Sequence, residues 1–237
     1  MQNPATSSHF RVGLVLFPNL TQLDLTGPYE VLSRLPRTTV DLVAADERTV
    51  SSERGLSMTP TATFDSAPPI DLLCVPGGVG VNAMMEDDRL LEFLARTGAS
   101  ARYVTSVCTG ALLLGAAGLL RGYRATTHWL SLDLLPVFGA IPVEERVVVD
   151  RNRITGGGVT AGIDFGLTIA AEAFGREIAE EIQLVIEYDP APPLQAGSPR
   201  SASASLVDRV SRSRERLQAD RRAIAQRAAR RIDKSTV

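Results

Sequence analysis

Short apolar runs recur along the chain, separated by longer segments whose apolar residues are spaced three or four positions apart. A continuous apolar run of roughly four to eight residues is typical of a strand buried on both faces. The runs that predict strands are residues 11–17, 38–45, 70–75, 102–107, 147–150 and 153–155. Residues 50–63 are polar and β-branched, which predicts a small excursion or hairpin.

The segments between these runs have helical character. The predicted helices are residues 29–35, 84–98, 109–120 and 163–174. Pro28 precedes the first of them and is expected in its first turn, where a missing N–H is tolerated. Strands that alternate with helices of this length indicate βαβ units, so we expect an α/β fold with a mostly parallel sheet.

The chain also divides by composition. Residues 1–10 are expected to form a disordered leader, and residues 11–188 a single α/β domain. Residues 189–204 are rich in proline and small residues, which predicts a linker. Residues 205–232 are expected to form one long C-terminal helix with a narrow apolar stripe. The stripe consists of Leu206, Val210, Leu217, Ile224, Ala228 and Ile232.

The overall composition excludes several classes of protein. The 237 residues are 44% hydrophobic and 22% charged, which is typical of a globular chain. The longest uncharged apolar run, residues 110–120, falls short of the ~20 residues needed to span a bilayer. The first ten residues have no apolar segment of the secretory type, so we expect a cytoplasmic protein that does not bind membranes. Two cysteines and two histidines are too few for a disulfide framework or a structural zinc site.

Charge is unevenly distributed along the chain. Residues 198–237 hold eleven basic and four acidic residues, a net charge of +7, so the remainder carries −9. Both signs of charge follow this segment and aromatic residues are absent from it, which disfavours nucleic-acid binding. We therefore expect a solvated helix that packs on a partner subunit and partly balances the acidic body.

The strongest candidate for chemistry is Cys108, in the sequence Ser106–Gly110. A nucleophile flanked by small residues between a strand and a helix is typical of an elbow that lifts the side chain above the sheet. The N-terminus of the following helix would lower the pKa of the thiol from its usual ~8.5. The alternative is a small buried cysteine that only packs.

Other candidates lie at neighbouring strand ends. Asp24 is either a charge at a helix start or a desolvated carboxyl beside Cys108. Gly77 and Gly78 form either a tight turn or an oxyanion-type pocket that uses backbone N–H groups. We expect Cys74, within an apolar strand, to be a core residue, and His128 to be structural.

Five motifs, which follow one another in the right order along the chain, resemble those of the ThiJ/PfpI superfamily and, within it, of the isocyanide hydratases. The motifs are Leu23–Pro28 (LDLTGP), Val75–Gly78 (VPGG), Ser106–Ala111 (SVCTGA), Ala125–Trp129 (ATTHW) and Thr160–Phe165 (TAGIDF). The resemblance covers residues 11–193. It implies a flavodoxin-like (class I glutamine amidotransferase-like) sandwich that forms a homodimer. It also implies a nucleophile at Cys108, a partner carboxyl at Asp24 and a third catalytic residue at Thr109, whose hydroxyl and N–H face the site.

The resemblance further implies a reaction. An isocyanide would be hydrated to an N-substituted formamide through a covalent thioimidate on Cys108, with no metal or organic cofactor. Thr109 stands where the protease-like branch has histidine, which argues against peptidase activity. The alternatives are a cysteine-based oxidation sensor, a glyoxalase-type enzyme, or a ligand-sensing domain like that of AraC-type regulators. Whether Cys74, His128 or Asp164 contacts the site depends on the fold.

Overall fold

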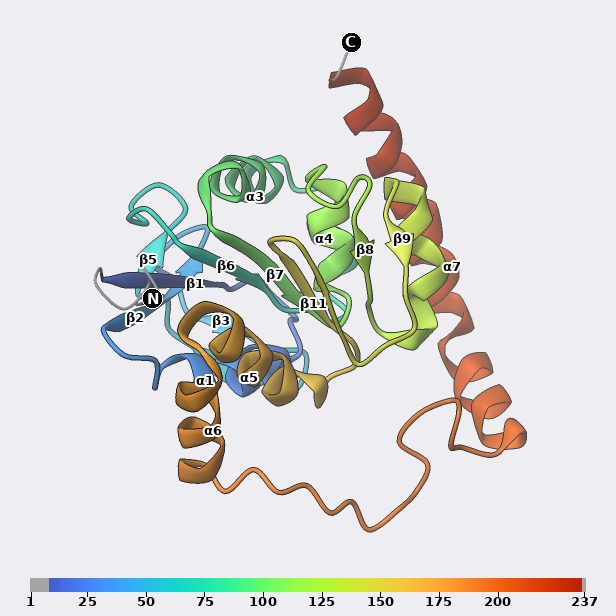
Figure 1. Cartoon of the computed structure of the whole chain (residues 1–237). Coiled ribbons are helices and arrows are strands. Elements are labelled where there is room, and N and C mark those ends of the chain that lie inside the picture. The colour runs from blue at the N-terminus through green and yellow to red at the C-terminus, as the bar shows by residue number, and fades with distance from the viewer. Residues whose placement is uncertain (1–8, 236–237) are drawn as a thin grey trace.

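The computed structural model describes residues 9–235 and contains a seven-stranded central sheet (Figure 1). The strand order is β10 (Val147–Asp150), β11 (Arg153–Gly156), β7 (Tyr103–Val107), β6 (Leu72–Val75), β1 (Phe10–Val15), β2 (Thr38–Ala44) and β5 (Ala62–Thr63). All neighbours pair in parallel except β10 and β11, which are antiparallel. The prediction of an α/β fold with a mostly parallel sheet is therefore confirmed.

The central strands have the sequences expected of a parallel sheet covered on both faces. Every residue of β6 is buried, because helices shield both of its faces and leave no side for polar residues. β1 begins at Phe10, so this last residue of the predicted leader belongs to the sheet. Residues 1–8 of that leader lie outside the described residues.

Helices cover the two faces of the sheet. On one face lie α1 (Gln22–Leu32), α5 (Ala161–Phe174) and α6 (Arg176–Val185). The other side carries α2 (Val81–Met84), α3 (Asp88–Ser100), α4 (Gly110–Ala116), the 3₁₀ segment η2 (Trp129–Phe138) and α7 (Ala204–Ser235). Figure 1 shows α3 and α4 on the opposite side of the sheet from α1 and α5.

Helix α1 begins earlier than the sequence predicted. It starts at Gln22, so Pro28 lies inside the helix and not in its first turn. The proline ring packs against α5, where a Cβ on Gly162 would come within 2.9 Å of Pro28 Cδ. This close approach of α1 and α5 offsets the hydrogen bond lost at Pro28. The earlier start places Asp24 in the first turn of the helix.

Smaller elements complete the domain. The hairpin predicted within residues 50–63 is present as β3 (Val50–Ser51) paired antiparallel with β4 (Ser57–Met58). A second small sheet, formed by β8 (Arg124–Ala125) and β9 (Ile141–Pro142), was not predicted, and neither were α6 and η2. Helix α6 is strongly amphipathic, with Ala179 and Ile182 buried, so its sequence carried a helical signal that the prediction missed.

The C-terminal helix α7 packs against its own chain. Its apolar positions contact η2, α4 and α2, and Ala225 and Ala228 belong to the buried core. The helix thus has an intrachain contact, and its expected packing on a partner subunit stays a prediction. Figure 1 shows α7 at the edge of the domain beyond β9, with a long loop running to it from α6.

Charge pairs accompany this packing. The helix pairs Arg222 with Asp133 and Arg227 with Glu86 of the acidic body, which confirms the expected charge balance. None of the described helices has the combination of length and apolarity that crossing a membrane requires.

Candidate active site

The site lies where three adjacent parallel strands end. Asp24 follows β1, Gly77 and Gly78 follow β6, and Cys108 follows β7. The Gly77 N–H donates to Asp24 Oδ2 at 3.0 Å, and the Gly78 N–H donates to Thr109 Oγ1 at 3.0 Å. The three predicted strand ends are therefore joined in one hydrogen-bonded cluster at the carboxyl edge of the sheet.

Cys108 occupies a sharp turn between β7 and α4. Its φ angle is +55°, in the left-handed region that a non-glycine residue enters at a cost of about 1–2 kcal/mol. The Cys108 N–H donates to the carbonyl oxygens of Gly156 and Gly157, at 3.0 and 2.8 Å, and these bonds hold the turn. A Cβ on Gly110 would overlap the Val75 carbonyl, so the small residue after the elbow is a steric requirement.

Asp24 is a buried carboxyl beside the thiol. Burial raises its pKa from 3.8 to about 7, and the negative charge of Glu53 acts in the same direction. Hydrogen bonds with Cys108 and with the Gly77 N–H lower the pKa in part. Oδ1 is buried and accepts no hydrogen bond that the geometry of the described residues shows, which leaves it available to the Cys108 thiol.

The electrostatics at Cys108 differ from the expectation. Burial raises the pKa of the thiol well above its usual range, and the charge of Asp24 raises it further. The Thr109 N–H and the charge of Arg221 lower it, but less than burial raises it. The predicted lowering of the pKa by the N-terminus of α4 is therefore wrong in direction, because removing the sulfur from water outweighs the helix end.

Gly77 and Gly78 hold two neighbouring side chains of the site in place through their backbone N–H groups. Their N–H groups, proposed for a developing charge on the substrate, already donate to Asp24 and Thr109. Gly77 also lacks space for a side chain, since a Cβ would come within 2.8 Å of Asp24 Oδ2. In this structure the two glycines thus orient the acid and the threonine.

Two charged residues at the site were missed from the sequence. Arg221 of α7 is 3% exposed and donates to the Gly78 carbonyl oxygen at 3.3 Å. Glu53, between β3 and β4, accepts from the Thr21 hydroxyl at 3.0 Å and raises the pKa of Asp24 through its charge. Neither residue stands in a recognisable motif, and both reach the site from segments distant along the chain.

Cys74 and His128, two further candidates from the sequence, both have structural roles. Cys74 is fully buried within β6, and burial raises the pKa of its thiol to about 12, so the core interpretation is confirmed. His128 caps η2, accepting from the Leu130 N–H at 3.3 Å, which agrees with a structural role. Burial, with the charges of Arg221 and Arg214, lowers the pKa of His128 to about 4.

Asp164 lies in a separate network. It pairs with Arg146 and accepts from the Tyr188 hydroxyl at 3.1 Å. These three residues line a pocket of about 690 Å³ between α1, α5 and the segment after α6. Leu23, the neighbour of Asp24, lines the same pocket, so this cavity borders the elements that carry the site.

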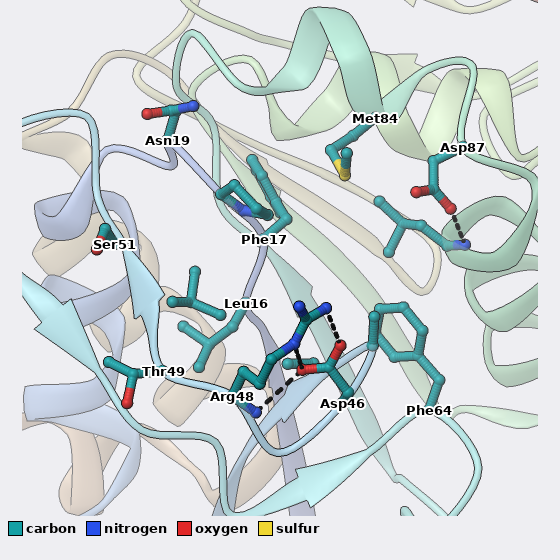
Figure 2. A pocket seen from close by; sticks show the side chains of 15 residues that line it. Leu16, Phe17, Asn19, Asp46, Arg48, Thr49, Ser51, Phe64, Met84 and Asp87 are labelled. Carbon is teal, nitrogen blue, oxygen red and sulfur yellow. Dashed lines mark hydrogen bonds and ion pairs between the residues drawn. The ribbon is translucent and has the colours of Figure 1, made fainter.

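A second pocket, of about 480 Å³, opens at the carboxyl ends of β1 and β2 (Figure 2). Its lining is largely apolar, and Figure 2 shows the Arg48 guanidinium paired with Asp46 at its edge. Neither Asp24 nor Cys108 lines it. Within residues 9–235 no group of three or more His, Cys, Asp or Glu side chains is placed to hold a metal ion.

Fold and site together define a class of protein. The strand order β2-β1-β6-β7-β11 is that of a flavodoxin-like sheet, and a cysteine on an elbow faces a buried acid at its carboxyl edge. Residues 10–172 match the model of the DJ-1/PfpI family. The chain belongs to the DJ-1/PfpI family, which confirms the resemblance seen in the sequence.

Two curated proteins and one crystal structure are similar to this chain over most of its length. The chain is 57% identical over 198 residues to an isonitrile hydratase of Pseudomonas putida, covering 84% of this chain and 87% of that one. It is 31% identical over 186 residues to the HTH-type transcriptional regulator GbdR of Pseudomonas aeruginosa, covering 75% of this chain but 50% of the regulator. A crystal structure of a ThiJ/PfpI family protein from Pseudomonas syringae superposes with a TM-score of 0.90 at 44% identity, covering 93% of this chain and 92% of that one.

Proposed function

We propose that this protein hydrates an isocyanide to an N-substituted formamide, with Cys108 as nucleophile and Asp24 as acid and base. The observation that carries the proposal is the buried Asp24–Cys108 pair, in which burial brings the pKa of the carboxyl to about 7. A carboxyl with such a pKa can both donate and accept a proton at neutral pH. The 57% identity with the isonitrile hydratase supports the choice of substrate class.

The first half of the reaction adds sulfur to carbon. Transfer of the Cys108 proton to Asp24 leaves a thiolate beside a neutral carboxylic acid. The sulfur attacks the terminal carbon of the isocyanide, R–N≡C, and a C–S bond forms. Asp24 then delivers the proton to the same carbon, which gives the thioimidate R–N=CH–S–Cys108. No electron is gained or lost overall, so the step requires no redox partner.

The second half consumes water. Asp24, again a carboxylate, removes a proton from a water molecule whose oxygen adds to the thioimidate carbon. The nitrogen receives the proton from Asp24, and the C–S bond of the tetrahedral intermediate breaks. The products are R–NH–CHO and the Cys108 thiolate, which regains its proton from the hydroxyl group of the intermediate.

Hydrogen bonds from the surrounding residues hold the side chains of Cys108 and Asp24 in place. The Thr109 N–H donates to the Cys108 sulfur, and the Thr109 hydroxyl oxygen accepts from the Gly78 N–H. Gly77 holds Asp24 Oδ2, and Oδ1 is buried with no hydrogen-bond partner among the described residues, so it is free to exchange a proton. We assign Thr109, Gly77 and Gly78 to this supporting role and the chemistry itself to Cys108 and Asp24.

A turnover assay tests the proposal. Purified protein is mixed with an aryl isocyanide, and formamide formation is followed by ultraviolet absorbance. We expect turnover in the wild type and none in Cys108→Ala or Asp24→Asn. Cys74→Ala is the matched control, because this second cysteine is buried in β6 and takes no part in the steps above. Full activity in Cys108→Ala, or none in the wild type, contradicts the assignment.

The oxidation-sensor alternative has less support. Oxidation of a cysteine by peroxide starts from the thiolate and requires access to solvent. Those conditions apply equally to the nucleophile of a hydratase, so the preference for the hydratase rests on the 57% identity with the isonitrile hydratase. No feature of the site favours a glyoxalase over a hydratase. The likeness to GbdR extends over half of the regulator, and we do not propose that activity for this chain.

We further propose that the protein acts in the cytoplasm as a homodimer. Large apolar side chains on and after α6 are exposed, Leu184 by 82% and Leu194 by 76%, which supports an interface there. Sedimentation equilibrium of the full chain tests this proposal. A dimer that Leu184→Arg converts to a monomer is the expected result, and a wild-type monomer contradicts it.

A further inference from the structure

A single buried arginine connects the C-terminal helix to the active site. Arg221 is 3% exposed, whereas the side chains of its neighbours Arg222 and Arg227 are about half exposed and pair with surface carboxylates. Burying a guanidinium is costly unless its donors are satisfied and a negative charge compensates it. An arginine in this position therefore requires a reason beyond the packing of α7.

The hydrogen bonds of Arg221 give each of its three nitrogens one acceptor without neutralising its charge. Nε donates to Asn82 Oδ1 at 2.8 Å, Nη1 to Ser131 Oγ at 3.1 Å and Nη2 to the Gly78 carbonyl oxygen at 3.3 Å. All three acceptors are uncharged. Among the described residues, no carboxylate forms an ion pair with Arg221, unlike Arg222 and Arg227 of the same helix.

The third of these bonds leads to the nucleophile. The Gly78 carbonyl oxygen that accepts from Arg221 also lies 3.4 Å from the Thr109 hydroxyl. The N–H of the same glycine donates to that hydroxyl, and the Thr109 N–H in turn binds the Cys108 sulfur. The guanidinium is thus two residues removed, through hydrogen bonds, from the reacting atom.

The charges around the sulfur identify what Arg221 compensates. Asp24 faces Cys108 from α1, and Arg221 faces it from α7. Glu53, between β3 and β4, acts on both Asp24 and Arg221, and His128 of the η2 cap lies near Arg221. Because the pKa of His128 is lowered to about 4, the imidazole is neutral near pH 7. Arg221 is thus the positive charge acting on the sulfur.

We propose that Arg221 is a positioning residue that, through Gly78 and Thr109, holds a positive charge behind Cys108 and favours the ionised sulfur over the ionised Asp24. The inference rests on the proposed function of the Asp24–Cys108 pair. The hydrogen bonds that lead from Arg221 through Gly78 and Thr109 end at the sulfur, so the positive charge favours moving the proton from Cys108 to the carboxyl. The C-terminal helix is then a part of the active site and not an accessory to the fold.

Alkylation of Cys108 tests this without any substrate. The full-length protein, with Cys74 replaced by alanine, is treated with iodoacetamide between about pH 6 and pH 10, and the modification of Cys108 is followed by mass spectrometry. Arg221→Gln removes the charge but keeps an amide donor, and Arg221→Lys keeps the charge. Arg222→Gln, one residue away on the exposed side, is the matched control.

The expected outcomes separate charge from structure. Arg221→Gln should slow alkylation at neutral pH by about tenfold and move its midpoint upward by roughly one pH unit. Arg221→Lys should retain the wild-type midpoint, and Arg222→Gln should match the wild type throughout. In the turnover assay, Arg221→Gln should lower kcat with little change in KM, because the residue does not touch the substrate.

Two results would overturn the inference. One is a wild-type alkylation profile in Arg221→Gln whose near-ultraviolet circular dichroism is unchanged. The other is Arg221→Lys with a midpoint raised as far as in Arg221→Gln, since the effect would then be geometric and not electrostatic. Neither result depends on isocyanide turnover. If the protein hydrates no isocyanide but gives the expected alkylation profiles, the proposed function is wrong and the inference about Arg221 still holds.

Discussion

Replacing Asp24 by asparagine is expected to inactivate the protein and stabilise it at the same time. The carboxyl has a pKa of about 7 in the folded protein, against 3.8 for an ordinary aspartate, because burial disfavours its charge. The folded state therefore binds the Asp24 proton more tightly than the unfolded state does. The free energy of unfolding accordingly falls as the pH rises from about 4 to about 7.

The size of the effect follows from the shift in pKa. Each unit corresponds to about 1.4 kcal/mol. A rise from 3.8 to about 7 then makes the ionised Asp24 cost at most about 4 kcal/mol of stability above neutral pH. Asparagine has a similar shape, can accept from the Gly77 N–H and carries no charge. Asp24→Asn should be nearly as stable as the wild type at about pH 4 and more stable by up to about 4 kcal/mol at about pH 8.

Urea unfolding at a series of pH values measures this difference. The gain in Asp24→Asn must grow with pH across the whole window, because it tracks ionisation of the wild-type carboxyl. Asp46→Asn is the control, since pairing with Arg48 lowers the pKa of that carboxyl to about 2, and removing it cannot produce a gain that grows with pH. A stability difference independent of pH, or a loss at about pH 8, would refute the reasoning about the burial of Asp24.

Three further predictions concern the elbow and the helix beside it. Gly110→Ala should cost about 1–3 kcal/mol in urea unfolding and slow alkylation of Cys108, because its Cβ overlaps the Val75 carbonyl; unchanged stability would contradict this. Cys108→Gly should be about 1 kcal/mol more stable than Cys108→Ala, since glycine relieves the φ of +55°, and equal urea midpoints would disprove the strain. Arg227→Gln should leave the thermal unfolding midpoint nearly unchanged at both low and high salt, because its pairing with Glu86 is half exposed, and a large fall at low salt would contradict this.

The sequence predicted best what depends on short stretches of chain. The apolar run that became β6 is buried on both faces in a parallel strand, and no distant residue is needed to read that pattern. The elbow at Cys108 was predicted in the same way, from small residues at fixed positions between a strand and a helix. Its positive φ and the steric demand at Gly110 confirm the reason for those small residues.

The errors have physical causes of their own. Helix α1 was predicted too short because Pro28 normally marks a first turn, but contact with α5 makes an internal proline acceptable. The pKa of Cys108 was predicted in the wrong direction because the helix N-terminus is visible in the sequence, whereas the depth of burial is not. Burial depends on all the elements that cover the sulfur, and these come from the entire chain.

By itself the sequence determined the alternation of strands and helices and the family, and it predicted the position of the nucleophile, because each is encoded in contiguous residues. Only the tertiary structure decided how the charges act on one another. Arg221 lies 113 positions after Cys108 along the chain, yet α7 brings its guanidinium to the Gly78 carbonyl. Electrostatic energies depend on distance through space and on exclusion of water, and neither quantity can be read along a chain.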